Sequence, residues 1–270
     1  MMALIEDYRF LTVLSIAAIA GTATFVPAHS QLPVKTLSCA APAGLSHFAL
    51  PLNRVAGRLA AGEPLTIVAI GSSSTAGAGA SSVAANYPSR LAVELKQRFP
   101  LRTIKVINHG VGGTEMGDML AKFDQDVTAE KPDLVLWQLG TNSVLRDRNL
   151  NGAAGKIDNG LSRIKKLGAD VILVNPQYAP KVLAKSETEN MVQIISAAAN
   201  QANVNLFDRF AVMRHWRMAE NIPFSAFLSP DGLHMNDWSY ACVAKLLGGA
   251  IFDAATRPAM TATAPTMPAH

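Results

Sequence analysis

Short apolar runs alternate with longer amphipathic segments along most of this chain. The run from Leu65 to Ile70 is β-branched and apolar and stops abruptly at the small residues of 71–77. Runs of this kind predict buried strands that end in tight turns, here over 65–70, 104–108, 133–139, 171–174 and 204–207. The amphipathic segments predict helices over 87–99, 116–128, 153–167, 186–202, 209–220 and 237–255. Because strand and helix alternate five times, we expect a mostly parallel α/β sheet with helices on both faces.

The two ends of the chain depart from this pattern. Phe10 to Val26 is almost wholly apolar, and Ala28-His29-Ser30 has the small residues of a signal cleavage site. We therefore expect residues 1–30 to be a cleaved signal and the protein to be secreted or periplasmic. The alternative is an N-terminal membrane anchor, since ~17 apolar residues are at the short end of a spanning helix.

The same pattern divides the remainder of the chain. We expect residues 31–62 to be a lead-in with a short helix near 54–61, and residues 63–255 to form the main domain. The tail over 256–270 is rich in Pro, Ala and Thr, and we expect it to be disordered. Ser186 and Glu189 have the spacing of a capping box at the start of the helix over 186–202.

Composition and charge narrow the class of protein. A chain of 270 residues that is 49% hydrophobic and 16% charged suits one globular domain with a large core. The formal net charge is only +4, and Lys165-Lys166 is the only adjacent basic pair. Since a nucleic-acid surface needs clustered basic side chains, we expect no nucleic-acid partner.

The two cysteines leave a choice open. In an exported protein, Cys39 and Cys242 are enough for one disulfide, which would tie the segment before the first strand to the last helix. Two buried free thiols are the alternative. No spacing of cysteine and histidine suggests a metal site.

Four loops fall on one edge of the predicted sheet, because the carboxyl ends of parallel strands meet there. They carry Ser73, Gly113, Asn142 and the pair Asp231 and His234. Each alone is a common turn residue. Together they supply what acyl transfer needs, which is a nucleophile, a base, an orienting acid and an oxyanion site.

The residue types suggest their roles. A serine hydroxyl needs a base to take its proton, and His234 can act near neutral pH. Asp231, three residues earlier, is close enough to orient the imidazole. The backbone N–H groups of Ser73 and Gly113 and the Asn142 side-chain amide can bind an oxyanion. His109 also falls at this edge and could line the pocket, but a solvated turn histidine is the alternative, and His234 is the preferred base.

These blocks resemble the SGNH hydrolases, also called the GDSL lipase/esterase family. Gly71-Ser72-Ser73-Ser74-Thr75 matches Gly-Asp-Ser-x-Thr, and Asn108 to Gly113 matches the block that ends in the oxyanion glycine. Gly140-Thr141-Asn142 matches Gly-x-Asn, and Asp231-Gly232-Leu233-His234 matches Asp-x-x-His. Order and spacing agree from residue 65 to about 250. No Gly-x-Ser-x-Gly elbow, P-loop or Gly-x-Gly-x-x-Gly fingerprint is present.

The resemblance implies a three-layer, flavodoxin-like α/β/α sandwich and a serine esterase that needs neither metal nor cofactor. It assigns Ser73 as nucleophile, His234 as base and Asp231 as its partner, with Gly113 and Asn142 as oxyanion donors. One residue departs from the pattern, since Ser72 replaces the family's aspartate. We expect that change to alter loop support or local charge.

The substrate is less closely defined than the chemistry. Family members act on lipids, thioesters, aryl esters and acetylated sugars. The export signal, with no obvious long apolar lid, favours short acyl groups such as acetyl, carried on polysaccharide or other small esters. The alternatives are a lipase or thioesterase for longer chains, and a non-catalytic carbohydrate-binding module on the same fold. The sequence leaves the oligomeric state open.

Overall fold

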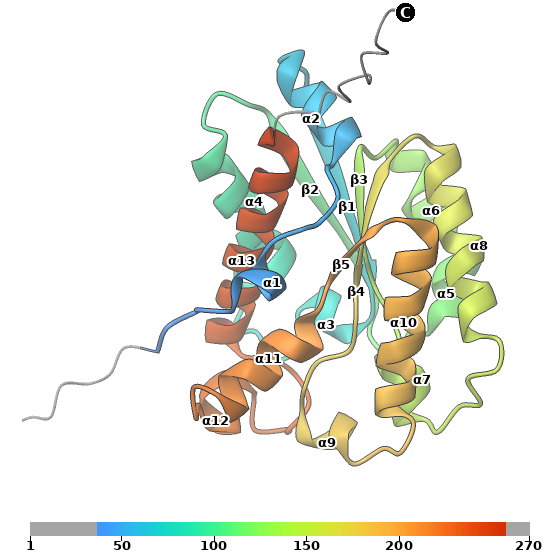
Figure 1. Cartoon of the computed structure of the whole chain (residues 1–270), viewed down its shortest axis with the longest axis vertical. Coiled ribbons are helices and arrows are strands. Elements are labelled where there is room, and N and C mark those ends of the chain that lie inside the picture. The colour runs from blue at the N-terminus through green and yellow to red at the C-terminus, as the bar shows by residue number, and fades with distance from the viewer. Residues whose placement is uncertain (1–36, 258–270) are drawn as a thin grey trace, which may run out of the picture. The chain divides into compact units, whose positions relative to one another are not determined.

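A five-stranded parallel sheet is the centre of the fold (Figure 1). The computed structural model describes residues 37–257, so the predicted signal and most of the predicted tail lie outside the described residues. The strand order is β2-β1-β3-β4-β5, and every neighbouring pair is parallel. The strands are β1 (Leu65–Gly71), β2 (Ile104–Gly110), β3 (Leu134–Gln138), β4 (Asp170–Val174) and β5 (Asn205–Phe207). The predicted fold class is confirmed.

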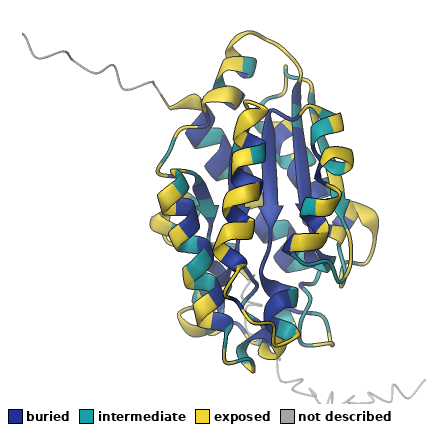
Figure 2. Cartoon of the chain, turned by 90° about the vertical axis from the view of Figure 1, so that its right-hand side faces the viewer, coloured by how far each residue is buried: buried dark blue, intermediate teal, exposed yellow. Residues whose placement is uncertain are grey.

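Helices cover both faces of this sheet. Helix α4 packs against α13 on one face, and α5, α8 and α10 lie together on the other (Figure 1). Strands β1, β3, β4 and β5 are mostly buried and the edge strand β2 is partly exposed, whereas the outer faces of the helices are exposed (Figure 2). The longer helices are α2 (Asn53–Ala60), α4 (Tyr87–Arg98), α5 (Met116–Ala121), α8 (Ala153–Lys166), α10 (Thr188–Ala202), α11 (Arg209–Met218) and α13 (Asp237–Thr256). Among residues 37–257, no helix has the length and apolar character required to cross a membrane.

Short helices lie between the longer elements, and all but α6 occupy positions for which the apolar pattern predicted no helix. They are α1 (Ala43–Ser46), α3 (Ser73–Ala76), α6 (Phe123–Asp126), α7 (Thr141–Leu145), α9 (Pro180–Leu183) and α12 (Phe224–Phe227). The single helix predicted over 116–128 is wrong, because the backbone leaves the helical region at Lys122 and separates α5 from α6. The capping box predicted at Ser186 is also absent. Helix α10 begins at Thr188, whose hydroxyl instead donates to the Val182 carbonyl at 2.5 Å.

The cysteine pairing is settled by the fold. Cys39 and Cys242 form a disulfide with their Cα atoms 5.1 Å apart, across 203 residues of sequence. It joins the segment before α1 to helix α13. In the chain-entropy description, closing so long a loop stabilises the folded chain by about 5 kcal/mol.

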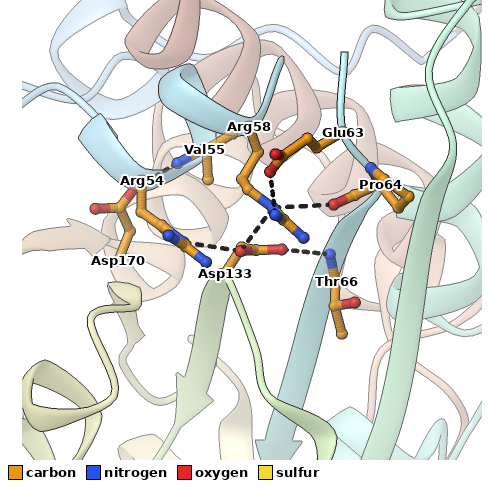
Figure 3. A network of polar contacts seen from close by, with 8 residues as sticks. All are labelled: Arg54, Val55, Arg58, Glu63, Pro64, Thr66, Asp133 and Asp170. Carbon is orange, nitrogen blue, oxygen red and sulfur yellow. Dashed lines mark hydrogen bonds and ion pairs between the residues drawn. The ribbon is translucent and has the colours of Figure 1, made fainter. Parts of the chain in front are cut away.

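A network of charges fixes α2 to the amino ends of the strands (Figure 3). The buried Asp133 accepts hydrogen bonds from Arg54 Nε and from the Thr66 backbone N–H, both at 2.9 Å. Asp170 accepts from the Val55 N–H at the start of α2, at 3.0 Å. Burial raises the pKa of Asp170, although these hydrogen bonds and the nearby arginine partly oppose that shift. The lead-in helix is therefore tied to the sheet at the end opposite the predicted site.

Candidate active site

The nucleophile loop lies where β1 ends. Gly71 is the last residue of β1, Ser72 is extended, and Ser73 is the first residue of α3. Gly71 and Gly110 end two neighbouring strands in register. Any Cβ at Gly110 would come within 2.2 Å of the Ala76 backbone nitrogen, so only glycine allows α3 to lie this close to β2.

Ser73, His234 and Asp231 form a continuous chain of hydrogen bonds. His234 Nε2 lies 2.9 Å from Ser73 Oγ, and His234 Nδ1 lies 2.5 Å from Asp231 Oδ2. An ionised carboxylate can only accept, so the imidazole carries its proton on Nδ1 and leaves Nε2 free to accept from the serine hydroxyl. The three predicted residues are brought together across 161 positions of sequence.

The loop that holds the acid is itself well braced. Asp231 Oδ1 accepts from Ser229 Oγ at 2.7 Å and from the backbone N–H groups of Leu233 and His234, each at 2.9 Å. Partial desolvation acts to raise the pKa of Asp231, but the hydrogen bonds from His234, Ser229 and Leu233 outweigh it and hold that pKa well below its usual range. Asp231 therefore stays a carboxylate, the form that stabilises an imidazolium.

The three predicted oxyanion donors come from three separate loops. Within the described residues, neither the Ser73 N–H nor the Gly113 N–H donates to another protein atom. Gly113 has a φ of +80°, a left-handed angle that suits glycine. Asn142 uses one amide N–H to donate to the Thr114 carbonyl at 2.8 Å. This bond fixes the amide plane and leaves the second N–H for a ligand.

Comparison with known proteins identifies the family of the chain. The sequence profile of the Non-GDSL lipase-like family matches residues 38–257. The chain belongs to this family. The predicted SGNH-type hydrolase is thereby confirmed as the family of this protein.

Two characterised proteins share part of the sequence. An acetylxylan esterase from Geobacillus stearothermophilus is 38% identical over 56 residues, which are 21% of this chain and 26% of that protein. An arylesterase from Vibrio mimicus is 28% identical over 131 residues, which are 48% of this chain and 62% of that protein. The matched parts thus span about a quarter of the first relative and less than two thirds of the second.

Solved structures show that the fold is shared. A two-domain esterase (CEX) active on acetylated mannans matches with a TM-score of 0.68 and 22% identity, over 83% of this chain and 60% of that chain. A variant of Axe2, an acetylxylan esterase from Geobacillus stearothermophilus, matches with a TM-score of 0.60 and 20% identity, over 69% and 94% of the two chains.

In this member of the Non-GDSL lipase-like family, Ser72 has a structural role. It is buried, and its N–H and its hydroxyl both donate to Gln138 Oε1, at 2.8 and 3.0 Å. Thr75 Oγ1 lies 3.3 Å from the same oxygen. Gln138, at the end of β3, therefore holds the loop that carries Ser73 through these contacts. Ser74 is buried too, which leaves Ser73 as the serine that meets His234.

A second amide, Gln177, joins two loops of the site. Its Oε1 accepts from Thr141 Oγ1 and from Arg209 Nη2, both at 3.0 Å, and its Nε2 lies 3.3 Å from the Leu233 carbonyl. Thr141 precedes Asn142, and Leu233 precedes His234. Arg209 is fully buried, and desolvation lowers its pKa to about 10. No local sequence pattern marks this pair, because Gln177 and Arg209 meet only through the fold.

Glu115 joins the glycine loop to α7. It accepts from Arg146 Nη1 at 2.7 Å, from Arg148 Nε at 3.2 Å and from Ser143 Oγ at 3.2 Å. Desolvation acts to raise the pKa of Glu115, but these partners lower it overall. Gly113 lies two residues before Glu115, and Asn142 directly precedes Ser143, so these contacts link the segments that carry two of the predicted oxyanion donors.

His109, which was expected either to line the pocket or to be a solvated turn residue, is paired with acidic side chains. Its Nε2 lies 3.1 Å from Glu130 Oε1, and its Nδ1 lies 4.0 Å from Asp126 Oδ1. These acids follow α5 along the chain, so the ring is paired within the β2–β3 connection and makes no contact with Ser73. Among the described residues, no group of three or more His, Cys, Asp or Glu side chains could hold a metal ion.

Proposed function

We propose that this protein is a serine ester hydrolase that releases short acyl groups, such as acetyl, from carbohydrate. The observation that carries the proposal is the hydrogen-bond chain from Ser73 Oγ through His234 to Asp231. It is supported by the Ser73 and Gly113 N–H groups, which have no acceptor within the described residues, and by the second N–H of the Asn142 amide. Nucleophile, base and orienting acid in this arrangement are the parts that acyl transfer requires.

The first half of the reaction forms an acyl-serine. His234 Nε2 takes the proton of Ser73 Oγ as that oxygen attacks the ester carbonyl, and the former carbonyl oxygen becomes an oxyanion. The N–H groups of Ser73 and Gly113 and the Asn142 amide bind it. The C–O bond of the ester then breaks, and the imidazolium, stabilised by Asp231, gives its proton to the leaving alcohol.

The second half reverses these steps with water. His234 takes a proton from water as the water oxygen attacks the acyl carbon, and the same donors bind the second oxyanion. The bond to Ser73 Oγ breaks, and His234 returns the proton to that oxygen. The products are one alcohol and one carboxylic acid, and the enzyme regains its starting state.

The relatives support acetylated carbohydrate as the substrate class. One sequence relative is named an acetylxylan esterase, and the CEX structure belongs to an esterase active on acetylated mannans. A chain-length series of p-nitrophenyl esters tests the acyl preference. We expect kcat/KM to be highest for acetate, and a higher value for a long acyl chain would favour the lipase or thioesterase alternative.

Substitution of the nucleophile tests the activity itself. We expect Ser73→Ala to lower p-nitrophenyl acetate turnover by at least about 10⁴-fold, whereas the matched Ser74→Ala keeps most of it. A serine-directed phosphonate is expected to label the wild type at Ser73. Equal rates for wild type and Ser73→Ala would contradict the proposal, and failure of labelling would favour a non-catalytic carbohydrate-binding module.

We further propose that residues 1–30 direct export, with cleavage near Ser30. The support is the apolar run ahead of Ala28-His29-Ser30. Determination of the amino terminus of the mature protein tests this. A protein that keeps its first residues and remains with the membrane fraction would favour the N-terminal anchor.

A further inference from the structure

A cleft of about 720 Å³ opens beside the oxyanion site. Its lining includes Gly113 and Ser143, and it also includes Lys156 of helix α8. Gly113 is a proposed oxyanion donor, and Ser143 directly follows the proposed donor Asn142. A substrate whose ester carbonyl reaches these donors can therefore extend into the cleft.

The size and the lining of the cleft suit a sugar chain better than an acyl chain. Its volume lies within the range of whole ligand sites, which is about 300–1,000 Å³, and an acetyl group needs far less. The buried Met116, Leu150 and Ala153 contribute small apolar areas, but charged and amide side chains surround them. A long hydrocarbon chain would desolvate those polar groups without replacing their hydrogen bonds.

The charges of the cleft do not balance. Arg146 and Arg148 share the single carboxylate of Glu115. The other acid, Asp118, already accepts from the Glu115 backbone N–H at 2.8 Å. Lys156 is exposed and has no acidic partner within the part of the chain that the structure describes. The lining therefore carries three cations and two carboxylates, and among the described residues Lys156 is the lining cation without an acidic partner.

We propose that this cleft binds the carbohydrate part of an acetylated acidic glycan, with Lys156 pairing to a uronic-acid carboxylate. The proposal rests on the proposed function for the ester end, because it assumes that the acetyl carbonyl lies at the oxyanion donors. It adds a specificity that neither the triad nor the relatives assign. A neutral glycan would leave the Lys156 charge without a partner in the cleft.

Direct binding tests the cleft independently of catalysis. Calorimetry with an oligogalacturonate that carries no ester measures affinity for the full-length wild type. We expect binding that weakens with salt between about 0.02 M and about 0.5 M, since exposed charges are screened, and that weakens about threefold in Lys156→Gln. Lys166→Gln is the matched control, since Lys166 is exposed on the same helix but outside the cleft.

Kinetics then test whether the binding is productive. The measured quantity is kcat/KM for an acetylated oligogalacturonate divided by kcat/KM for an acetylated xylo-oligosaccharide of equal length. We expect a ratio above one in the wild type, a fall of about threefold in Lys156→Gln, and no change in Lys166→Gln.

The outcomes separate the two proposals. No binding of oligogalacturonate, or equal affinity in the wild type and Lys156→Gln, would overturn the acidic-glycan site. Binding that depends on Lys156 but leads to no turnover of any acetyl ester would retain the site and reject the esterase. A kinetic ratio at or below one in an active wild type would also overturn the proposed specificity.

Discussion

The two ends of the parallel sheet use similar polar groups to opposite purposes. At the amino end, Asp133 is buried and faces Arg54, Arg58 and a backbone N–H, so its lone pairs are engaged by the fold. At the carboxyl end, Asp231 is partly exposed and engages His234, whose other nitrogen reaches Ser73. The Asp133 carboxylate ends a structural network, whereas the Asp231 carboxylate orients the imidazole that is proposed to take the Ser73 proton.

The same contrast holds for hydrogen-bond donors. The Thr66 N–H and the Val55 N–H are both bonded to carboxylates at the amino end. At the carboxyl end, the N–H groups of Ser73 and Gly113 have no acceptor within residues 37–257. Donors that the fold leaves unpaired are available to a ligand, which is why the site lies at this end. We therefore expect substitutions at the carboxyl end of the sheet to change activity and substitutions at the amino end to change stability.

The largest expected effect is that of Asp231→Asn. An amide at this position would favour the wrong tautomer of His234, so we expect kcat for p-nitrophenyl acetate to fall about 10⁴-fold. The free energy of unfolding near neutral pH is expected to change much less than the activation free energy does, because the Asp231 side chain is 40% exposed. Steady-state kinetics and urea unfolding of the same preparation check both parts. Parallel losses of activity and stability would contradict the contrast between the two ends.

The next effect is that of Asn142→Ala. Loss of one oxyanion donor is expected to lower kcat by about 10²-fold to 10³-fold. Because the amide also donates to Thr114, a smaller loss of stability accompanies it. The KM for p-nitrophenyl acetate should change little, since the interaction forms with the oxyanion and not with the ground-state carbonyl. A rise in KM with unchanged kcat would assign Asn142 to ground-state binding instead.

Asp133→Ala is expected to show the converse behaviour. It leaves the Thr66 N–H without its carboxylate and removes the partner of two arginines, and we expect a loss of about 3 kcal/mol in the free energy of unfolding. The kcat of the folded fraction should be kept. Asp124→Ala is the control, because its ion pair with Arg163 is on the surface and should contribute little to stability. Equal losses in the two variants would reject the structural importance of the network.

The sequence was informative where a residue's role follows from its neighbours in the chain. The apolar runs predicted the five strands, and the four turn blocks predicted Ser73, Gly113, Asn142, Asp231 and His234, which the structure places around one edge. The role of His109 stayed open between two alternatives, because its partner Glu130 lies 21 residues away. The side-chain amides that support the site loops were not predicted, for the same reason. Gln138 lies 66 residues from Ser72, and Gln177 lies 56 residues from Leu233. Amides in strands and loops have no local pattern that marks such contacts.

The smallest effects are those of pH on stability. The contributions of Asp170, at the amino end, and Asp231, at the carboxyl end, should change in opposite directions with pH. The folded pKa of Asp170 is raised, so its contribution is present below the unfolded pKa of about 3.9 and is lost as pH rises through the folded value. The folded pKa of Asp231 is lowered, so its contribution is present above about 3.9 and is lost as pH falls towards the folded value.

Two asparagine variants isolate these contributions. Relative to the wild type, Asp170→Asn should gain stability as pH rises from about 4, because it removes a carboxylate that is costly to ionise there. Asp231→Asn should instead gain relative stability as pH falls below about 4, where the wild type loses the benefit of its ionised acid. Thermal unfolding of the three proteins across that range measures both differences. If the relative stability of both variants changed in the same direction with pH, the folded pKa values of Asp170 and Asp231 would not be shifted in opposite directions.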